Sequence, residues 1–171
     1  MPTQQFNADR LRQLQEQLQI EYDKLHEFEK SISLAAGRDE KIALRQQIKF
    51  ELAPRLSKLE KEYAELLAAS VPVEAIPEKE AGALLTELDT AITKAEQSKP
   101  ADAPQEMLRL LEEIRSKLNE PGKTAEAKLK VALPIIPLIV SYEMKLDTEN
   151  FVTQVWGKAR DFFKGLASHP K

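Results

Sequence analysis

The segment Val131–Val140, with the sequence VALPIIPLIV, is an uncharged apolar run in a chain of which 31% of the residues are charged. An α-helix needs roughly 20 apolar residues to cross a bilayer, about twice the length of this run. Pro134 and Pro137 also interrupt it. Because exposed apolar surface costs free energy in water, we expect the run to be covered. The cover would be a core, a partner or a membrane surface.

The residues around the run are compatible with two structures. Up to Val140, apolar residues recur at steps of three and four, as on one face of a helix. From Tyr142 to Leu146 they alternate with charged residues, as in a strand. A lone strand is unstable, and only residues 71–76 could pair with it. The pattern favours a Pro-kinked helix or an extended plug over residues 131–146 and leaves one short strand open.

A terminal helix with an aromatic face is predicted next, and Asp147 or Thr148 can cap its start. Trp156 and Phe162 lie on its broad apolar face, opposite Lys158. The same pattern is typical of a core-facing helix and of a helix that lies in a membrane interface. Core-facing helices are far commoner, so we expect Ile136, Trp156 and Phe162 to make packing or partner contacts.

The first 70 residues predict a helical hairpin. Apolar residues at heptad positions predict one helix over residues 8–34, with Asn7 as its N-cap. Gly37 is suited to a left-handed C-terminal cap, and Asp39 is suited to cap a second helix over residues 39–69. Two long helices joined by a short loop pack antiparallel.

Pro54 interrupts the second helix. A proline inside a helix removes one backbone hydrogen bond and clashes one turn back, so a kink near Ala53 is expected. The narrow apolar stripes on both helices are wide enough for one partner helix each. Six residues are predicted to form the hairpin seam, with pairing of some of them between chains as the alternative: Leu18, Leu25, Phe28, Leu52, Leu59 and Tyr63.

The chain is thus predicted to be mostly all-α, with an antiparallel coiled-coil-like hairpin over residues 1–70. Residues 71–77 contain two prolines and are read as a linker. Residues 78–171 would form a small compact helical bundle. Within it, Asp102 begins a predicted capping box, and Thr124 is suited to cap a short helix that leads into the apolar run.

Composition excludes several classes of site. The net charge is −3, the middle of the chain is acidic and its end is only mildly basic, so a nucleic-acid surface is not expected. The chain has no cysteine, which excludes disulfides, thiolate zinc sites and cysteine nucleophiles. The N-terminus lacks the basic and apolar blocks of a signal peptide, so a cytoplasmic protein is expected, with membrane association possible on activation.

No motif predicts catalysis, a cofactor or a metal. Gly122-Lys123-Thr124 matches only the end of a phosphate-binding loop, without its first glycine or a preceding strand. Asp23 and His26 have the spacing of a metal-binding pair, but a bundle site needs a second imidazole from another helix. There is no Gly-x-Ser-x-Gly elbow for a serine nucleophile. We expect a protein that is not an enzyme.

Two segments resemble regions of known proteins. Residues 38–69, with KIALRQQI at 41–48 and LEKEYAELL at 59–67, resemble together with the first helix the helical hairpins at the ends of bacterial conflict and signalling proteins. Those hairpins lie beside NACHT-type ATPases, caspase-like peptidases or TIR domains. The segment from Lys128 to Trp156 is similar to another region of such multidomain proteins. The resemblance implies an adaptor or effector-associated role.

The sequence therefore predicts a non-catalytic helical interaction module of a bacterial signalling or defence system. It would assemble protein partners through helix seams and would form a homo-oligomer. The alternative is a membrane-perturbing cell-death effector, in which residues 131–166 leave the core on activation.

Overall fold

The structure is a computed structural model that describes residues 2–146 and 149–168. In chain order the elements are α1 (Pro2–Leu34), α2 (Arg38–Gln47), the π-helix η1 (Ile48–Leu52), α3 (Ala53–Ser70), the short 3-10 helix η2 (Val73–Ala75), α4 (Glu78–Ser98), α5 (Gln105–Leu118), α6 (Ala125–Ala132), α7 (Ile136–Leu146) and α8 (Phe151–Ser168). The described residues contain no strand, which confirms the all-α fold class. The residues after the apolar run, for which a short strand was an alternative, belong to the helix α7.

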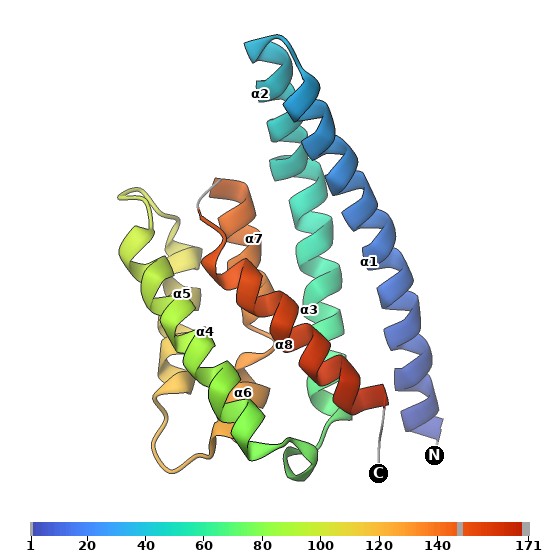
Figure 1. The fold of residues 1–171 in the computed structure, drawn as a ribbon, viewed down its shortest axis with the longest axis vertical. Coiled ribbons are helices and arrows are strands. Elements are labelled where there is room, and N and C mark those ends of the chain that lie inside the picture. The colour runs from blue at the N-terminus through green and yellow to red at the C-terminus, as the bar shows by residue number, and fades with distance from the viewer. Residues whose placement is uncertain (1, 147–148, 169–171) are drawn as a thin grey trace.

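The helices form a long hairpin and a bundle that shares its core. In Figure 1, α1 runs antiparallel to the continuous rod made by α2, η1 and α3. The helices α7 and α8 pack against the lower part of this rod, and α4, α5 and α6 pack with them to complete the bundle. The helix α7 is central, because it contacts α3, α5, α8 and η1. The upper part of the hairpin, with α2, projects beyond the bundle.

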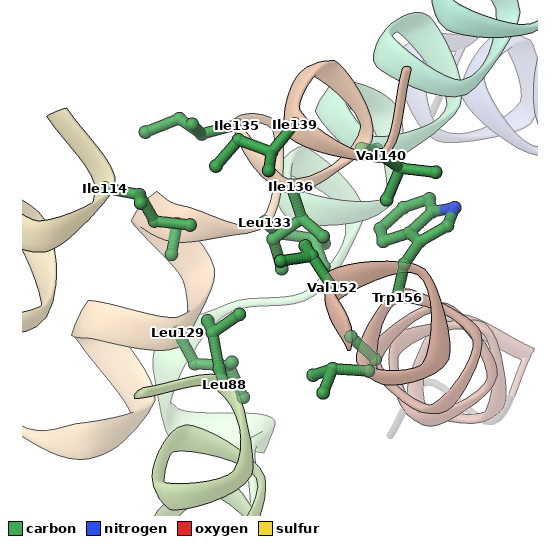
Figure 2. Packing of buried hydrophobic residues seen from close by; sticks show 14 of the residues in the cluster. Leu88, Ile114, Leu129, Leu133, Ile135, Ile136, Ile139, Val140, Val152 and Trp156 are labelled. Carbon is green, nitrogen blue, oxygen red and sulfur yellow. The ribbon is translucent and has the colours of Figure 1, made fainter. Parts of the chain in front are cut away.

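The apolar run lies in the centre of the core. Pro134 falls in the turn between α6 and α7, and Pro137 lies in the first turn of α7, where a missing N–H is tolerated. The side chains of Leu133 and Ile136 are fully buried and meet Val152 of α8 (Figure 2). Only Val131, at 37%, is exposed. The expectation that the run is kept dry is confirmed, and its own chain provides the cover.

The predicted break near Ala53 is a short π-helix and not a sharp bend between two α-helices. The Ala53 N–H donates to the carbonyl oxygen of Ile48, five residues back, which widens the turn just before Pro54. In a regular α-helix the proline ring would meet the carbonyl four residues back, at Phe50. The wider turn accommodates the proline, and the rod continues into α3.

Four of the predicted helix caps are wrong. Asn7 lies inside α1, which begins at Pro2. Gly37 is not left-handed, since its φ is −98°, and it replaces Asp39 as the N-cap of α2. The N-cap of α5 is Pro104, which has no side-chain cap, so the capping box at Asp102 does not form. Caps depend on one local hydrogen bond, which neighbouring packing easily overrides.

One predicted cap is confirmed and one lies outside the described residues. The Thr124 hydroxyl accepts a hydrogen bond from the Ala127 N–H at 3.2 Å and begins α6. Gly122, before it, has a φ of +80°, a conformation that favours glycine. The proposed caps of α8, Asp147 and Thr148, are outside the part of the chain that the structure describes.

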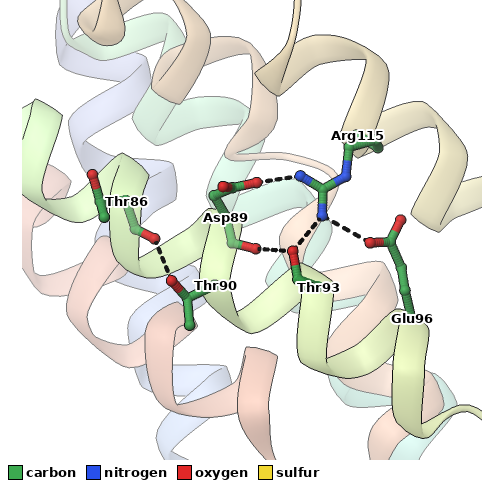
Figure 3. A network of polar contacts seen from close by, with 6 residues as sticks. All are labelled: Thr86, Asp89, Thr90, Thr93, Glu96 and Arg115. Carbon is green, nitrogen blue, oxygen red and sulfur yellow. Dashed lines mark hydrogen bonds and ion pairs between the residues drawn. The ribbon is translucent and has the colours of Figure 1, made fainter.

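A polar network joins α4 to α5 (Figure 3). The Arg115 guanidinium donates to Thr93 Oγ1 at 2.8 Å and to Glu96 Oε1 at 2.7 Å, and it also pairs with Asp89. Since Arg115 is the single residue of α5 in this network and its three partners all lie on α4, it fixes how the two helices sit along each other. The network explains why Arg115, which is partly exposed, lies between α4 and α5.

Candidate interaction surface

The hairpin changes its surroundings along its length. Its lower part is covered by the bundle, since α3 contacts α7 and α8. Its upper part, residues 20–52, is here called the arm, and within it α2 packs chiefly against α1 and η1. The helix α2 contains no buried residue. Towards its tip the arm therefore consists of α1 and α2 alone, whereas its base, at η1, also contacts α7.

A groove of about 610 Å³ lies along the arm. Its α1 side is built from Ile20, Lys24, Glu27 and Ser31, which recur at steps of three and four and so share one face of that helix. The other side comes from α2, η1 and the start of α3. The complete lining is Ile20, Asp23, Lys24, Glu27, Phe28, Ser31, Leu44, Glu51, Leu52 and Arg55. We call it the arm groove.

The rim of the arm groove is acidic. Both of its basic residues, Lys24 and Arg55, pair with Glu21 at 3.5 Å. Neither Glu27 nor Glu51 forms an ion pair with any described residue. Asp23 accepts a hydrogen bond from Gln19 but pairs with no cation of the described chain. The carboxylates are thus the uncompensated charges of the groove.

Large apolar side chains are exposed on the same arm. Phe50, in η1, is 74% exposed, Ile20 is 55% exposed and Ile42 is 40% exposed. Leu34, at the end of α1, is also exposed. Single exposed apolar residues are ordinary, but four of them on one arm, of which Ile20 also lines the arm groove, favour a region that contacts another molecule.

The opposite side of the arm faces the bundle across a smaller groove of about 270 Å³. Here α1 contributes Tyr22, Leu25, Glu29 and Ile32, which by helical periodicity lie on the face opposite the arm groove. The helix α7 contributes Val140 and Met144 on the other wall, among others. This space separates the arm from the bundle, and its walls belong to one chain.

A buried polar cluster fastens the hairpin to α8. Glu60 of α3 is only 3% exposed and accepts hydrogen bonds from the Tyr22 hydroxyl and, at 3.1 Å, from Arg160. The Arg160 guanidinium also lies 5.8 Å from the centre of the Tyr22 ring. Burial raises the pKa of Glu60, whereas Tyr22, Arg160 and the nearby Trp156 indole N–H oppose that rise. Arg160 offsets the charge of Glu60, and the cluster joins α1, α3 and α8, while Glu60 Oε2 is buried without a hydrogen-bond partner among the described residues.

A second buried carboxylate caps α8 from α7. Glu143 is 2% exposed, and its two oxygens accept from the Val152 N–H at 2.9 Å and from the Thr153 N–H at 2.8 Å. The Thr153 hydroxyl donates to the same carboxylate at 2.7 Å. These bonds satisfy backbone donors that the first turn of a helix leaves free. Burial raises the pKa of Glu143, and the three hydrogen bonds partly offset it.

The nine predicted contact residues all lie against the protein's own core. Leu18, Leu52, Tyr63, Ile136 and Trp156 are buried, and Leu25, Phe28, Leu59 and Phe162 are half-buried. Their contact with a partner stays a prediction, and it would require these side chains to be uncovered. The structure brings Phe28 and Leu52 together in the arm groove, while the others lie elsewhere.

Sequence reasoning missed the residues that the arm exposes. Ile20 lies off the heptad positions of α1, and Phe50 lies off the four-residue steps of the second stripe. Large apolar residues outside a stripe are the signal that could have found them. The Glu60 cluster had no such signal, because Glu60 and Arg160 are 100 residues apart.

The residues considered above as metal or phosphate ligands lie on the surface or in local structural contacts. His26 is exposed, and Asp23 accepts from Gln19. Lys123 pairs with Glu120 at 3.5 Å, beside the Thr124 cap. Over the described residues, no group of three or more His, Asp or Glu side chains could hold a metal ion.

Comparison with protein-family models, curated proteins and solved structures finds no match for this chain. Among the helices described, none combines the length and the apolar character needed to span a membrane.

Proposed function

We propose that the protein is a non-catalytic helical interaction module of a bacterial signalling or defence system, which assembles protein partners through its arm. The observation that carries this proposal is the arm, which has an open groove lined in part by Ile20 and which also exposes Ile42 and Phe50. The bundle supplies the stability that such an arm needs. The bacterial setting rests on the sequence resemblance.

The buried apolar run favours this proposal over a membrane-perturbing effector. Ile136 and Ile139 are fully buried, and α7 contacts three α-helices. Insertion into lipid would first have to remove α7 from this core, with loss of the Glu143 cap on α8. An exposed arm requires no such rearrangement.

Site-specific photo-crosslinking in the organism that encodes the chain tests the proposal. A photoreactive amino acid at Phe50 should give adducts heavier than the chain, whereas one at Glu112, an exposed residue of α5, should give few. Adducts with a second copy would show the expected homo-oligomer, and adducts with another protein would show a partner. Equal or absent adducts at the two positions would overturn the interaction role.

A further inference from the structure

The arm groove has the dimensions of a helix site. Along α1 it extends from Ile20 to Ser31, a rise of about 17 Å or three helical turns at 1.5 Å per residue. It lies between antiparallel helices, and an amphipathic helix binds such a groove with its apolar face. In the lower hairpin, α3 already has such neighbours in α7 and α8. A helix in the arm groove would cover the arm in the same way.

The charges of the rim select the occupant. Asp23, Glu27 and Glu51 carry three carboxylates without a cation among the described residues, whereas Lys24 and Arg55 are both engaged by Glu21. A helix with Lys or Arg beside its apolar face would compensate these carboxylates. A second copy of the same groove would bring carboxylates against carboxylates, which is repulsive.

We propose that the arm groove binds an amphipathic helix of a partner protein, with an apolar face flanked by lysine or arginine. The apolar contacts would come from Ile20, Phe28 and Leu44, and the acidic rim would set the orientation and charge preference. This inference deepens the proposed interaction role and rests on it.

A charge-swap titration tests the groove directly. The probes are two fluorescein-labelled helical peptides of about 18 residues, or five turns, which share one leucine face and carry lysine or glutamate elsewhere. Anisotropy of each probe is followed at low salt as the full chain is added. The lysine peptide should bind the wild-type chain at least about tenfold more tightly than the glutamate peptide, since opposite charges meet in a partly desolvated groove.

The variants locate the binding. Glu27→Lys with Glu51→Lys should weaken the lysine peptide about tenfold or more and strengthen the glutamate peptide. The matched control, Glu112→Lys with Glu113→Lys, makes the same change in net charge on exposed residues of α5 and should alter binding less than about twofold. Ile20→Gln should weaken both probes, whereas Ile42→Gln, outside the lining, should not. Circular dichroism checks that each variant is folded.

Three results would overturn the inference. They are failure of the wild-type chain to bind the lysine peptide, equal effects of the groove and control variants, and a wild-type dimer in light scattering that Ile20→Gln dissociates. The last result would assign the groove to a second copy. Crosslinks at Phe50 without peptide binding would leave the interaction role standing and remove only the assignment of the groove.

Discussion

The bundle and the arm use the same kinds of helix for different ends. In the bundle, apolar faces meet on several sides and the buried carboxylates Glu60 and Glu143 have hydrogen-bond donors. In the arm, α2 has no buried residue and Phe50 is 74% exposed. Buried side chains are therefore concentrated where α7 and α8 cover the hairpin. Changes on the surface of the arm should therefore leave the packing of the core unaltered.

The largest expected effect comes from emptying the centre of the bundle. Trp156→Ala should lower the free energy of unfolding by about 3–5 kcal/mol, because Trp156 is 2% exposed and its removal leaves a cavity. Urea unfolding followed by circular dichroism measures this. If the variant does not fold, Ile139→Val is the milder change, with an expected cost of about 0.5–1.5 kcal/mol. A cost near zero for both would contradict the assignment of the core.

The Glu143 cap is the next test of the bundle. Glu143→Gln should lower the free energy of unfolding by about 1–3 kcal/mol, since the amide NH₂ would face a backbone N–H and leave a buried donor unsatisfied. Glu112→Gln on the exposed face of α5 is the control and should change little. Equal stability of the two variants would mean that Glu143 does not cap α8.

The same carboxylate predicts a pH dependence. Because burial raises the pKa of Glu143 above its ordinary value of 4.5, the folded chain holds the proton more tightly than the unfolded chain. The stability that this tighter proton binding adds is fully present below pH 4.5. It is lost as the pH rises through the pKa of Glu143 in the folded chain. The stability difference between wild type and Glu143→Gln, measured by urea unfolding at several pH values, should therefore shrink above pH 4.5. A difference that grows with pH would show that the pKa is lowered instead.

Two arginines of α5 give a smaller and matched comparison. Arg115 joins α5 to α4 and its side chain is 25% exposed, whereas Arg109 pairs within its own helix and is 70% exposed. Arg115→Met should cost about 1 kcal/mol of unfolding free energy, and Arg109→Met should cost clearly less, because water screens its pair with Glu106. Thermal and urea unfolding measure both. A larger loss at Arg109 would contradict the role of the network.

The smallest effect is expected in the arm. Phe50→Gln should change the free energy of unfolding by no more than about 0.5 kcal/mol, because the side chain is largely in water already. Denaturant unfolding of this variant and of Trp156→Ala, measured under the same conditions, compares the arm with the bundle. A loss of more than about 2 kcal/mol would show that Phe50 packs within the folded chain.

Periodicity determined much of the fold. The stripes of α1 and the second rod, the Pro-rich break after Ser70 and the burial of the apolar run could all be predicted, because each depends on apolar residues repeated over many positions. Helix caps were less predictable, as Asn7 and Gly37 show. A cap depends on the hydrogen bond of one side chain, and the free energy of that bond is comparable to that of competing contacts.

The sequence alone was enough to predict that this chain is helical, where prolines divide it and which segment must be kept from water. Local periodicity and the cost of exposing apolar surface suffice for that. The tertiary structure alone decided which side of the hairpin is covered, because the answer depends on how α7 and α8 dock on α3. It also brought Glu60 to Arg160 and left Glu27 and Glu51 without an ion pair to any residue that the structure describes, since charge pairs are set by positions in space and not by distance along the chain.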